Sequence, residues 1–131
     1  MIEPHRKRLP DTRPSITHKA LVCGFEVYVT VSFYDEDTIR CNPAEVFSKL
    51  SKHGTEMSGL LDGFCIMVSL ALQYGVPWTK IRDKFLGTRF GAADETNKSL
   101  LDGLMKMVDR CIQERSDIIG EDEVETPQEQ D

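Results

Sequence analysis

One short segment combines basic side chains with a turn and a helix start, a combination that can bind an anion. It runs from Lys49 to Thr55 and contains Lys49, Lys52, His53, Gly54 and Thr55. The segment leaves a predicted strand and enters a predicted helix, whose first backbone N–H groups have no partner within the helix. Those groups, the helix dipole and the lysines favour a phosphate there. A structural interpretation is also open, in which Gly54 makes the turn, Thr55 caps the helix and the lysines are only solvated.

A second basic residue with binding potential, Arg89, follows a predicted helix and stands beside Phe90. A guanidinium next to an aromatic ring can hold a phosphate or stack on a base. It can equally anchor its own loop through hydrogen bonds to carbonyl groups. The first interpretation adds Arg89 to the phosphate site.

Catalytic and metal-binding patterns are not visible in the chain. The four cysteines form no Cys-x-x-Cys pair, and the histidines do not stand at ligand spacing beside them, so we expect neither a metal nor a cofactor. Cys23 and His18 are near in sequence only, and no paired acid site is apparent. Four aspartates at helical spacing are expected on exposed faces, namely Asp62, Asp83, Asp102 and Asp109. We therefore expect no catalytic residue and favour a protein that is not an enzyme.

Charge divides the chain into three parts. The net charge of the 131 residues is -6, but seven acids and no base follow residue 115, and the rest is close to neutral. The first 19 residues carry five bases and two acids. We expect an extended basic arm over 1–16, one domain over 17–115 and a disordered acidic tail over 116–131. A basic arm can contact phosphates, yet such arms are more often only solvated, so nucleic acid is a less favoured partner.

Alternating residues predict the strands. Val27, Val29, Val31 and Phe33 share one side of a strand over 26–34, with Tyr28 and Tyr34 on the other. Shorter strands are predicted over 17–22 and 45–50, with a turn at 23–24. Because these strands are close in sequence, we expect an antiparallel arrangement.

Helical spacing of apolar residues predicts three helices after the strands. The first is expected from Thr55 to near Gly75, central and buried, with Gly59 and Gly63 marking a close approach to another element. The second begins at Pro77 and ends at Gly87, and the third begins near residue 96. The fold class predicted is α+β, in two layers, with about three strands followed by three helices packed on one face. No apolar run approaches the length of a membrane span, so we expect a cytoplasmic protein without a membrane partner.

Several segments in order along the chain resemble a known family. The segments are 8–13, 16–19, 28–31, 45–52, 58–62, 69–77, 84–85 and 88–90. Together they span roughly residues 6–112, and the correspondence is most specific at 69–77, 84–85 and 88–90. The region resembles the C-terminal region of adenosylcobalamin-dependent (class II) ribonucleotide reductases and looks like the TSCPD domain.

The resemblance carries over only in part. The family's Thr-Ser-Cys-Pro-Asp stretch corresponds here to Thr96-Asn97-Lys98-Ser99, without its cysteine or proline. A thiol or metal role of that stretch therefore does not transfer. The chain is also too short for the reductase's catalytic barrel, so the resemblance implies kinship with a reductase module and not reductase activity.

Two functions follow as hypotheses. The first is a stand-alone, non-catalytic module, suited to a phage or bacterial accessory protein, that binds a nucleotide or another phosphate-bearing ligand. Arm residues would assist the phosphate site, namely Arg13, Thr17, His18 and Lys19. The alternative is an interaction subunit that docks on a ribonucleotide reductase or on itself as a homo-oligomer, through an exposed patch of Tyr28, Tyr34 and Trp78 or through a sheet edge.

Overall fold

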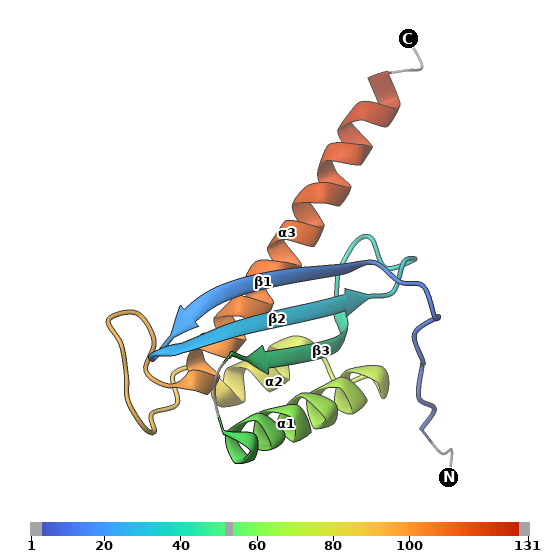
Figure 1. The fold of residues 1–131 in the computed structure, drawn as a ribbon. Coiled ribbons are helices and arrows are strands. Elements are labelled where there is room, and N and C mark those ends of the chain that lie inside the picture. Colours follow the sequence, from blue (N-terminus) through green and yellow to red (C-terminus); the bar gives the residue numbers. More distant parts are fainter. Residues whose placement is uncertain (1–3, 52–53, 129–131) are drawn as a thin grey trace.

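The computed structural model describes residues 4–51 and 54–128 and shows a three-stranded sheet followed by three helices (Figure 1). The sheet has the order β1-β2-β3, and both pairs are antiparallel. The α+β fold predicted from the sequence is therefore confirmed. The elements are β1 (Ser15–Val22), β2 (Phe25–Phe33), β3 (Pro43–Leu50), α1 (Thr55–Gln73), α2 (Trp78–Phe85) and α3 (Leu100–Gln128).

A two-residue turn sets the register of the first two strands. Cys23 and Gly24 both have positive φ, 50° and 85°. Positive φ at both central residues is the geometry of a type I′ turn, whose twist matches that of a hairpin. Val22 accordingly pairs with Phe25, and every later pair in β1 and β2 follows from this one.

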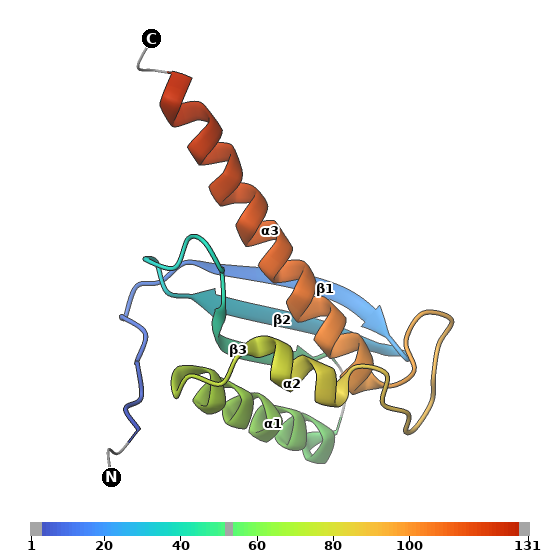
Figure 2. The same cartoon turned by 180° about the vertical axis from the view of Figure 1, so that it is seen from behind.

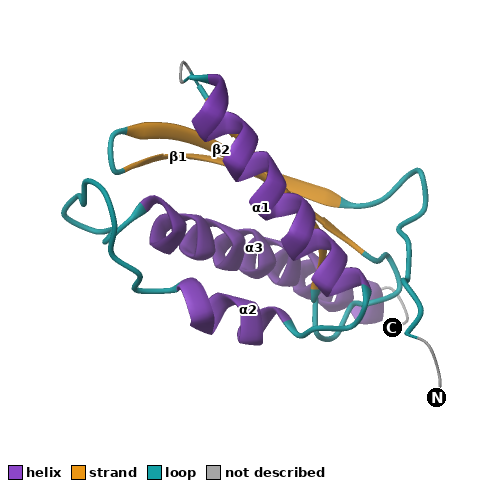
Figure 3. Cartoon of the chain, turned by 90° about the horizontal axis from the view of Figure 1, so that it is seen from below, coloured by secondary structure: helices purple, strands orange, loops and turns teal. Residues whose placement is uncertain are grey.

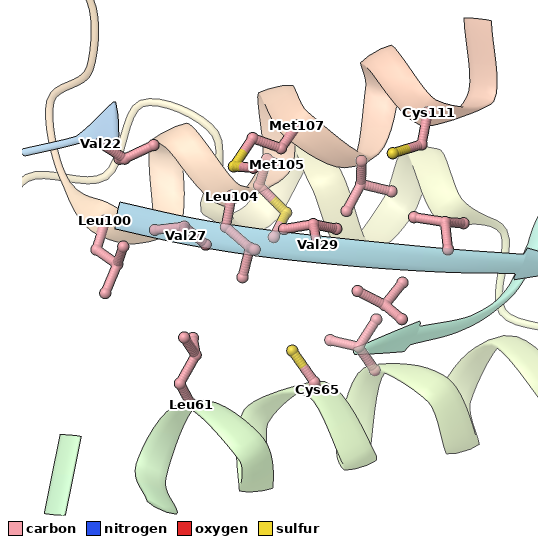
Figure 4. Packing of buried hydrophobic residues seen from close by; sticks show 14 of the residues in the cluster. Val22, Val27, Val29, Leu61, Cys65, Leu100, Leu104, Met105, Met107 and Cys111 are labelled. Carbon is pink, nitrogen blue, oxygen red and sulfur yellow. The ribbon is translucent and has the colours of Figure 1, made fainter. Parts of the chain in front are cut away.

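The helices cover one face of the sheet (Figure 2). Val27, Val29 and Val31 have no exposed surface, as their alternation predicts. They pack against Leu61 and Cys65 from α1 and against an apolar stripe of α3 (Figure 4). The α3 residues of this core are Leu100, Leu104, Met105, Met107, Val108 and Cys111. Helix α2 belongs to the same layer and packs against α3.

The first helix is less buried than its composition predicts. Between Glu56 and Gln73 the mean hydropathy is 1.2, so the helix is long and apolar enough for a membrane span, and 33% of these residues are buried. One side packs into the core through Leu61, Cys65, Val68 and Leu72. The opposite side is exposed. The predicted central and buried position therefore holds for one side of the helix only.

Glycine marks a close approach in α3 and not in α1. A Cβ at Gly59 or Gly63 would have no atom within 4 Å beyond its own helix, which contradicts the predicted close contact there. A Cβ at Gly103 would lie 2.3 Å from Cγ1 of Val22. This position lets α3 lie against the end of β1, because only glycine leaves room for the valine.

Both ends of α3 differ from expectation. The helix begins at Leu100, since Ser99 Oγ accepts the Asp102 backbone N–H at 3.1 Å as an N-cap would. The amides of Thr96 and Asn97, the predicted start, donate to the Asp94 carboxylate instead. At the other end α3 continues to Gln128, so the segment from Ser116 that we expected to be disordered is helical to that residue.

The basic arm is tied to the end of α1. Its described part is without helix or strand up to Ser15, where β1 begins two residues earlier than predicted. The backbone N–H of Lys7 donates to the Gln73 carbonyl at 2.9 Å, and Arg6 Nε donates to Gln73 Oε1 at 2.6 Å. Tyr34 Oη donates to the Lys7 carbonyl. The arm therefore runs past the C-terminal end of α1 (Figure 1).

Candidate functional site

The face of the sheet turned away from the helices, here called the open face, carries the residues best suited to bind a ligand. Figure 1 looks onto this face. The strand register places Lys19, Tyr28 and Lys49 in one row across β1, β2 and β3. All three are exposed. One row is therefore an aromatic ring between two lysines.

The next row widens this site. Thr17, Thr30 and Phe47 lie in register, and Thr17 Oγ1 and Thr30 Oγ1 are 2.9 Å apart. Phe47 is 48% exposed although it is a large apolar side chain, and it lies diagonally across from Tyr28. A hollow of about 500 Å³ is lined by both rows. Its residues are Thr17, Tyr28, Thr30, Phe47, Ser48, Lys49 and Ser51.

The two lysines of the face differ in their surroundings. Lys19 Nζ lies 3.2 Å from Glu26 Oε1 and 5.5 Å from the centre of the Tyr28 ring. The hydrogen bond to Glu26 raises the pKa of Lys19, so that this lysine stays charged at neutral pH. Lys49 has no ion-pair partner among residues 4–51 and 54–128. Its charge is therefore available to an anion without breaking a salt bridge.

Arg13 closes one end of the open face and is not free. Its Nη2 donates to both carboxylate oxygens of Glu45, at 2.8 and 3.0 Å. The carboxylate neutralises the guanidinium that we assigned to ligand binding. We infer that Arg13 holds the start of β1 against β3.

The phosphate site predicted from the loop before α1 is described only in part. Lys52 and His53 lie outside the described residues. Gly54 is the N-cap of α1 without a side-chain capping bond, and Thr55 is the first helical residue, so the predicted Thr55 cap is wrong. Arg89 is exposed in the loop between α2 and α3 and, within the described part of the chain, makes no hydrogen bond or ion pair with Gly54 or Lys49. Among the described residues of that set, Lys49 is the one on the open face.

The predicted arm contacts are divided between the two faces of the sheet. Thr17 and Lys19 are on the open face, because they alternate with inward residues along β1. His18 points to the helix side, where it lines a separate hollow with Asn97 and Lys106. One ligand on the open face therefore cannot contact all four predicted residues.

The loop that replaces the family motif is held by two carboxylates. Asp94 accepts the backbone N–H groups of Cys23, Thr96 and Asn97, and these bonds lower its pKa well below the usual range. Asp102 is 1% exposed, which contradicts the surface position predicted for it. It accepts the backbone N–H groups of Gly87 and Lys98 at 2.7 and 2.9 Å.

The charge of Asp102 is compensated inside this loop. Burial alone would raise its pKa, but the two backbone donors and Lys106, with Nζ 3.2 Å away, outweigh burial and lower it. Every oxygen of both carboxylates has a donor in the chain itself. Through these hydrogen bonds the loop joins α2, α3 and the β1–β2 turn.

The cysteines do not form a reactive site. Each of the four lies within the described residues, is buried and takes no part in a disulfide bond. Burial raises the pKa of the Cys65 thiol and raises that of Cys111 to about 11, so both stay protonated at neutral pH. Both side chains belong to the hydrophobic core, where they pack as small apolar groups.

Sequence reasoning missed Phe47 as a binding residue. The signal was the alternation in β3, where Val46 and Leu50 are buried and Phe47 and Lys49 are exposed. An aromatic residue in the polar phase of a strand indicates an exposed ring. Within the predicted strand over 45–50 the pattern is obscured, because polar Ser48 occupies the inward phase and apolar Phe47 the outward one.

Comparison with known proteins gives one consistent family. A family model described as the TSCPD domain matches residues 3–112. Over 95 residues the chain is 41% identical to a vitamin B12-dependent ribonucleotide reductase of Rhodopirellula baltica, covering 72% of this chain and 9% of that protein. The reductase of the same name from Streptomyces clavuligerus is 45% identical over 94 residues, with the same coverage.

A third reductase of this name, from Bradyrhizobium diazoefficiens, is 39% identical over 88 residues, which are 67% of this chain and 7% of that protein. The chain thus spans less than a tenth of the length of these relatives. No solved structure matches it.

Proposed function

The chain belongs to the TSCPD domain family, and from this premise we propose that it is a non-catalytic cytoplasmic module that binds a nucleotide on the open face of its sheet. The observation that carries the proposal is the row Lys19–Tyr28–Lys49 beside the exposed ring of Phe47. The resemblance to part of a nucleotide-reducing enzyme supports the class of ligand. The proposed site replaces the one predicted from the loop before α1.

The chemistry of the open face suits the two ends of a nucleotide. A base can stack on Tyr28 or Phe47, and such stacking contributes about 1–3 kcal/mol per base. The phosphates would lie near Lys49, whose charge has no partner among the described residues. Thr17 and Thr30 offer hydroxyl groups to the sugar or base at the floor of the hollow.

Binding by the intact chain tests the proposal directly. The probes are dATP, ATP, inorganic triphosphate and an oligothymidine, and the readouts are thermal shift and isothermal calorimetry. A nucleotide at about 100 times its Kd should stabilise the folded chain by roughly 2.7 kcal/mol. Inorganic triphosphate should bind more weakly, because it offers no base to the aromatic rings.

Matched variants locate the site. Lys49→Ala should weaken nucleotide binding at least about tenfold, whereas Lys80→Ala, an exposed lysine of α2, should leave it unchanged. The double variant Lys52→Ala/Arg89→Ala should also bind normally. Loss of binding in that double variant, with normal binding by Lys49→Ala, would move the site back to the loop. No binding of any probe by the wild-type chain would remove the proposal.

The interaction alternative needs a different surface from the one predicted. Trp78 is 3% exposed, and its indole N–H donates to Asp109 Oδ1 at 2.8 Å. It cannot form an exposed patch with Tyr28 and Tyr34. Docking on a reductase through that patch is therefore not proposed.

A further inference from the structure

The outward side of α1 is an apolar surface without a partner in the described structure. Leu60 is 74% exposed, Met67 66% and Ile66 54%. These residues lie opposite the buried side of the helix, and Gly63 is at the centre of the exposed side by helical spacing. Figure 3 shows α1 nearest the viewer, with no other element in front of it.

We infer that this surface binds a second copy of the chain, with the two α1 helices antiparallel and crossing at Gly63. A two-fold axis at Gly63 places residues at equal distances before and after it opposite each other. Gly59 then faces Met67 of the second copy, and Leu60 faces Ile66. Met67 of one copy therefore lies over the gap at Gly59 of the other. At the next position, Leu60 of one copy packs against Ile66 of the other.

The glycines permit this close contact. A Cβ at Gly59 or Gly63 would meet nothing within 4 Å, so the space above both residues is open. Without side chains there, two helix backbones can approach closely, and the neighbouring apolar side chains interdigitate. This explains why α1 keeps two glycines that lower its helix propensity and serve no contact within one chain.

Charges at the ends of the helix favour the antiparallel direction. Glu56 is exposed in the first turn of α1. Arg6 is exposed beside the last turn, where its Nε donates to Gln73. Antiparallel packing brings Glu56 of each copy toward Arg6 of the other, and it also opposes the two helix dipoles. Parallel packing would place like charges together.

The available area is sufficient for a specific contact. Tyr74 is also exposed, at the C-terminal end of the same surface. The four apolar side chains expose on the order of 500 Å² per copy, so that a dimer would bury about 1,000 Å², near the lower limit for a specific interface. We therefore expect a reversible dimer that depends on concentration.

Sedimentation velocity of the full chain over a wide range of concentration tests the dimer. Gly63→Leu should raise the dimer dissociation constant at least about tenfold, because the new side chain separates the helices. Within a single chain the new leucine side chain would enter open space, so the fold should be retained. Circular dichroism checks that the variant is folded. The matched control is Gly120→Leu in α3, where a Cβ also meets nothing, and it should dimerise like the wild type.

Cross-linking tests the symmetry axis. Gly63→Cys should form a disulfide-linked dimer under mild oxidation, because the two introduced thiols meet at the axis, whereas Gly120→Cys should not. The four native cysteines are buried and should not contribute.

Three results would overturn the inference. They are a wild-type monomer at every concentration, a dimer that Gly63→Leu does not weaken, or binding of the wild-type chain to phosphatidylcholine vesicles in place of dimerisation. The last result would assign the surface to lipid. None of them bears on nucleotide binding at the open face, which lies on another side of the molecule.

Discussion

The two faces of the sheet use the same strands for different purposes. On the helix-covered face, Val27, Val29 and Val31 are fully buried. On the open face, Tyr28 and Phe47 keep about a third to a half of their surface exposed. Burial of the first set stabilises the fold. The second set contributes less to folding, and it is the set to which we assign nucleotide binding.

The same contrast separates the loop before α3 from the open face. In the loop, Asp94 and Asp102 have all their hydrogen bonds satisfied within the chain. On the open face, Lys49 is exposed without an ion-pair partner in the described part of the chain. The charges of the loop are thus paired within the chain, whereas the charge of Lys49 is not paired among the described residues. The following variants measure how far stability and binding are separated.

The largest expected effect is in the core. Leu104 lies on the side of α3 that faces the sheet and is 1% exposed. Leu104→Ala should therefore lower the free energy of unfolding by about 3 kcal/mol, because burial is lost and a cavity is left behind. Urea denaturation measures the change. A loss below about 1 kcal/mol would show that α3 does not form a tight core with the sheet.

A smaller loss of the free energy of unfolding is expected from Asp102→Asn. The amide removes a buried charge that accepts two backbone N–H groups and pairs with Lys106, at a cost of about 2 kcal/mol at neutral pH.

The same variant predicts a pH dependence. Because the pKa of Asp102 is lower in the folded chain than the usual value near 3.9, its stabilisation is complete above that value. The stabilisation is lost as pH falls through the lower, folded pKa. Stability curves measured from neutral pH to pH 3 should therefore fall less steeply below about pH 4 for Asp102→Asn than for the wild type. Parallel curves would contradict this role.

A pair of glycine variants compares crowded and open positions of one helix. Gly103→Ala should destabilise by about 1–2 kcal/mol, because its Cβ would meet Val22. Gly120→Ala should stabilise by up to about 1 kcal/mol, because alanine favours the helix and the space is open. Thermal unfolding of both variants decides the comparison. An equal effect of both would mean that Val22 moves aside without cost.

The smallest expected effect on stability is at the open face. Phe47→Ala should change the free energy of unfolding by less than about 1 kcal/mol, since roughly half of the ring is already in solvent. Nucleotide affinity should nevertheless fall about tenfold if a base stacks on the ring. Calorimetry and urea denaturation of the same sample give both values. A large loss of stability with unchanged binding would reverse the roles assigned to the two faces.

Much of the fold follows from local patterns in the chain. Alternation from Val27 to Phe33 predicted the buried face of β2, and the Cys23–Gly24 turn predicted the hairpin. The family resemblance seen in the sequence is confirmed by the match over residues 3–112. The alternation and the turn depend on residues that are neighbours in sequence, and the family resemblance depends on many residues in order. One amino-acid sequence is therefore enough to predict all three.

The site was harder to predict, because its residues meet across strands. Lys19, Tyr28 and Lys49 are far apart in sequence and adjacent only through the register of three strands. Arg89 and Lys49, joined in the prediction, have no described contact. A side chain's neighbours across a sheet depend on pairing distant segments, which residue type does not reveal.

Side-chain periodicity alone thus determined which residues share a face, since the geometry of a strand or helix places them there. Packing of distant elements decided which faces are covered. It buried Asp102, which local spacing placed at the surface, and Trp78, which the interaction hypothesis placed in an exposed patch. It also left one side of α1 exposed despite its apolar composition. The physical reason is that burial depends on what the rest of the chain places against a surface, and no segment carries that information by itself.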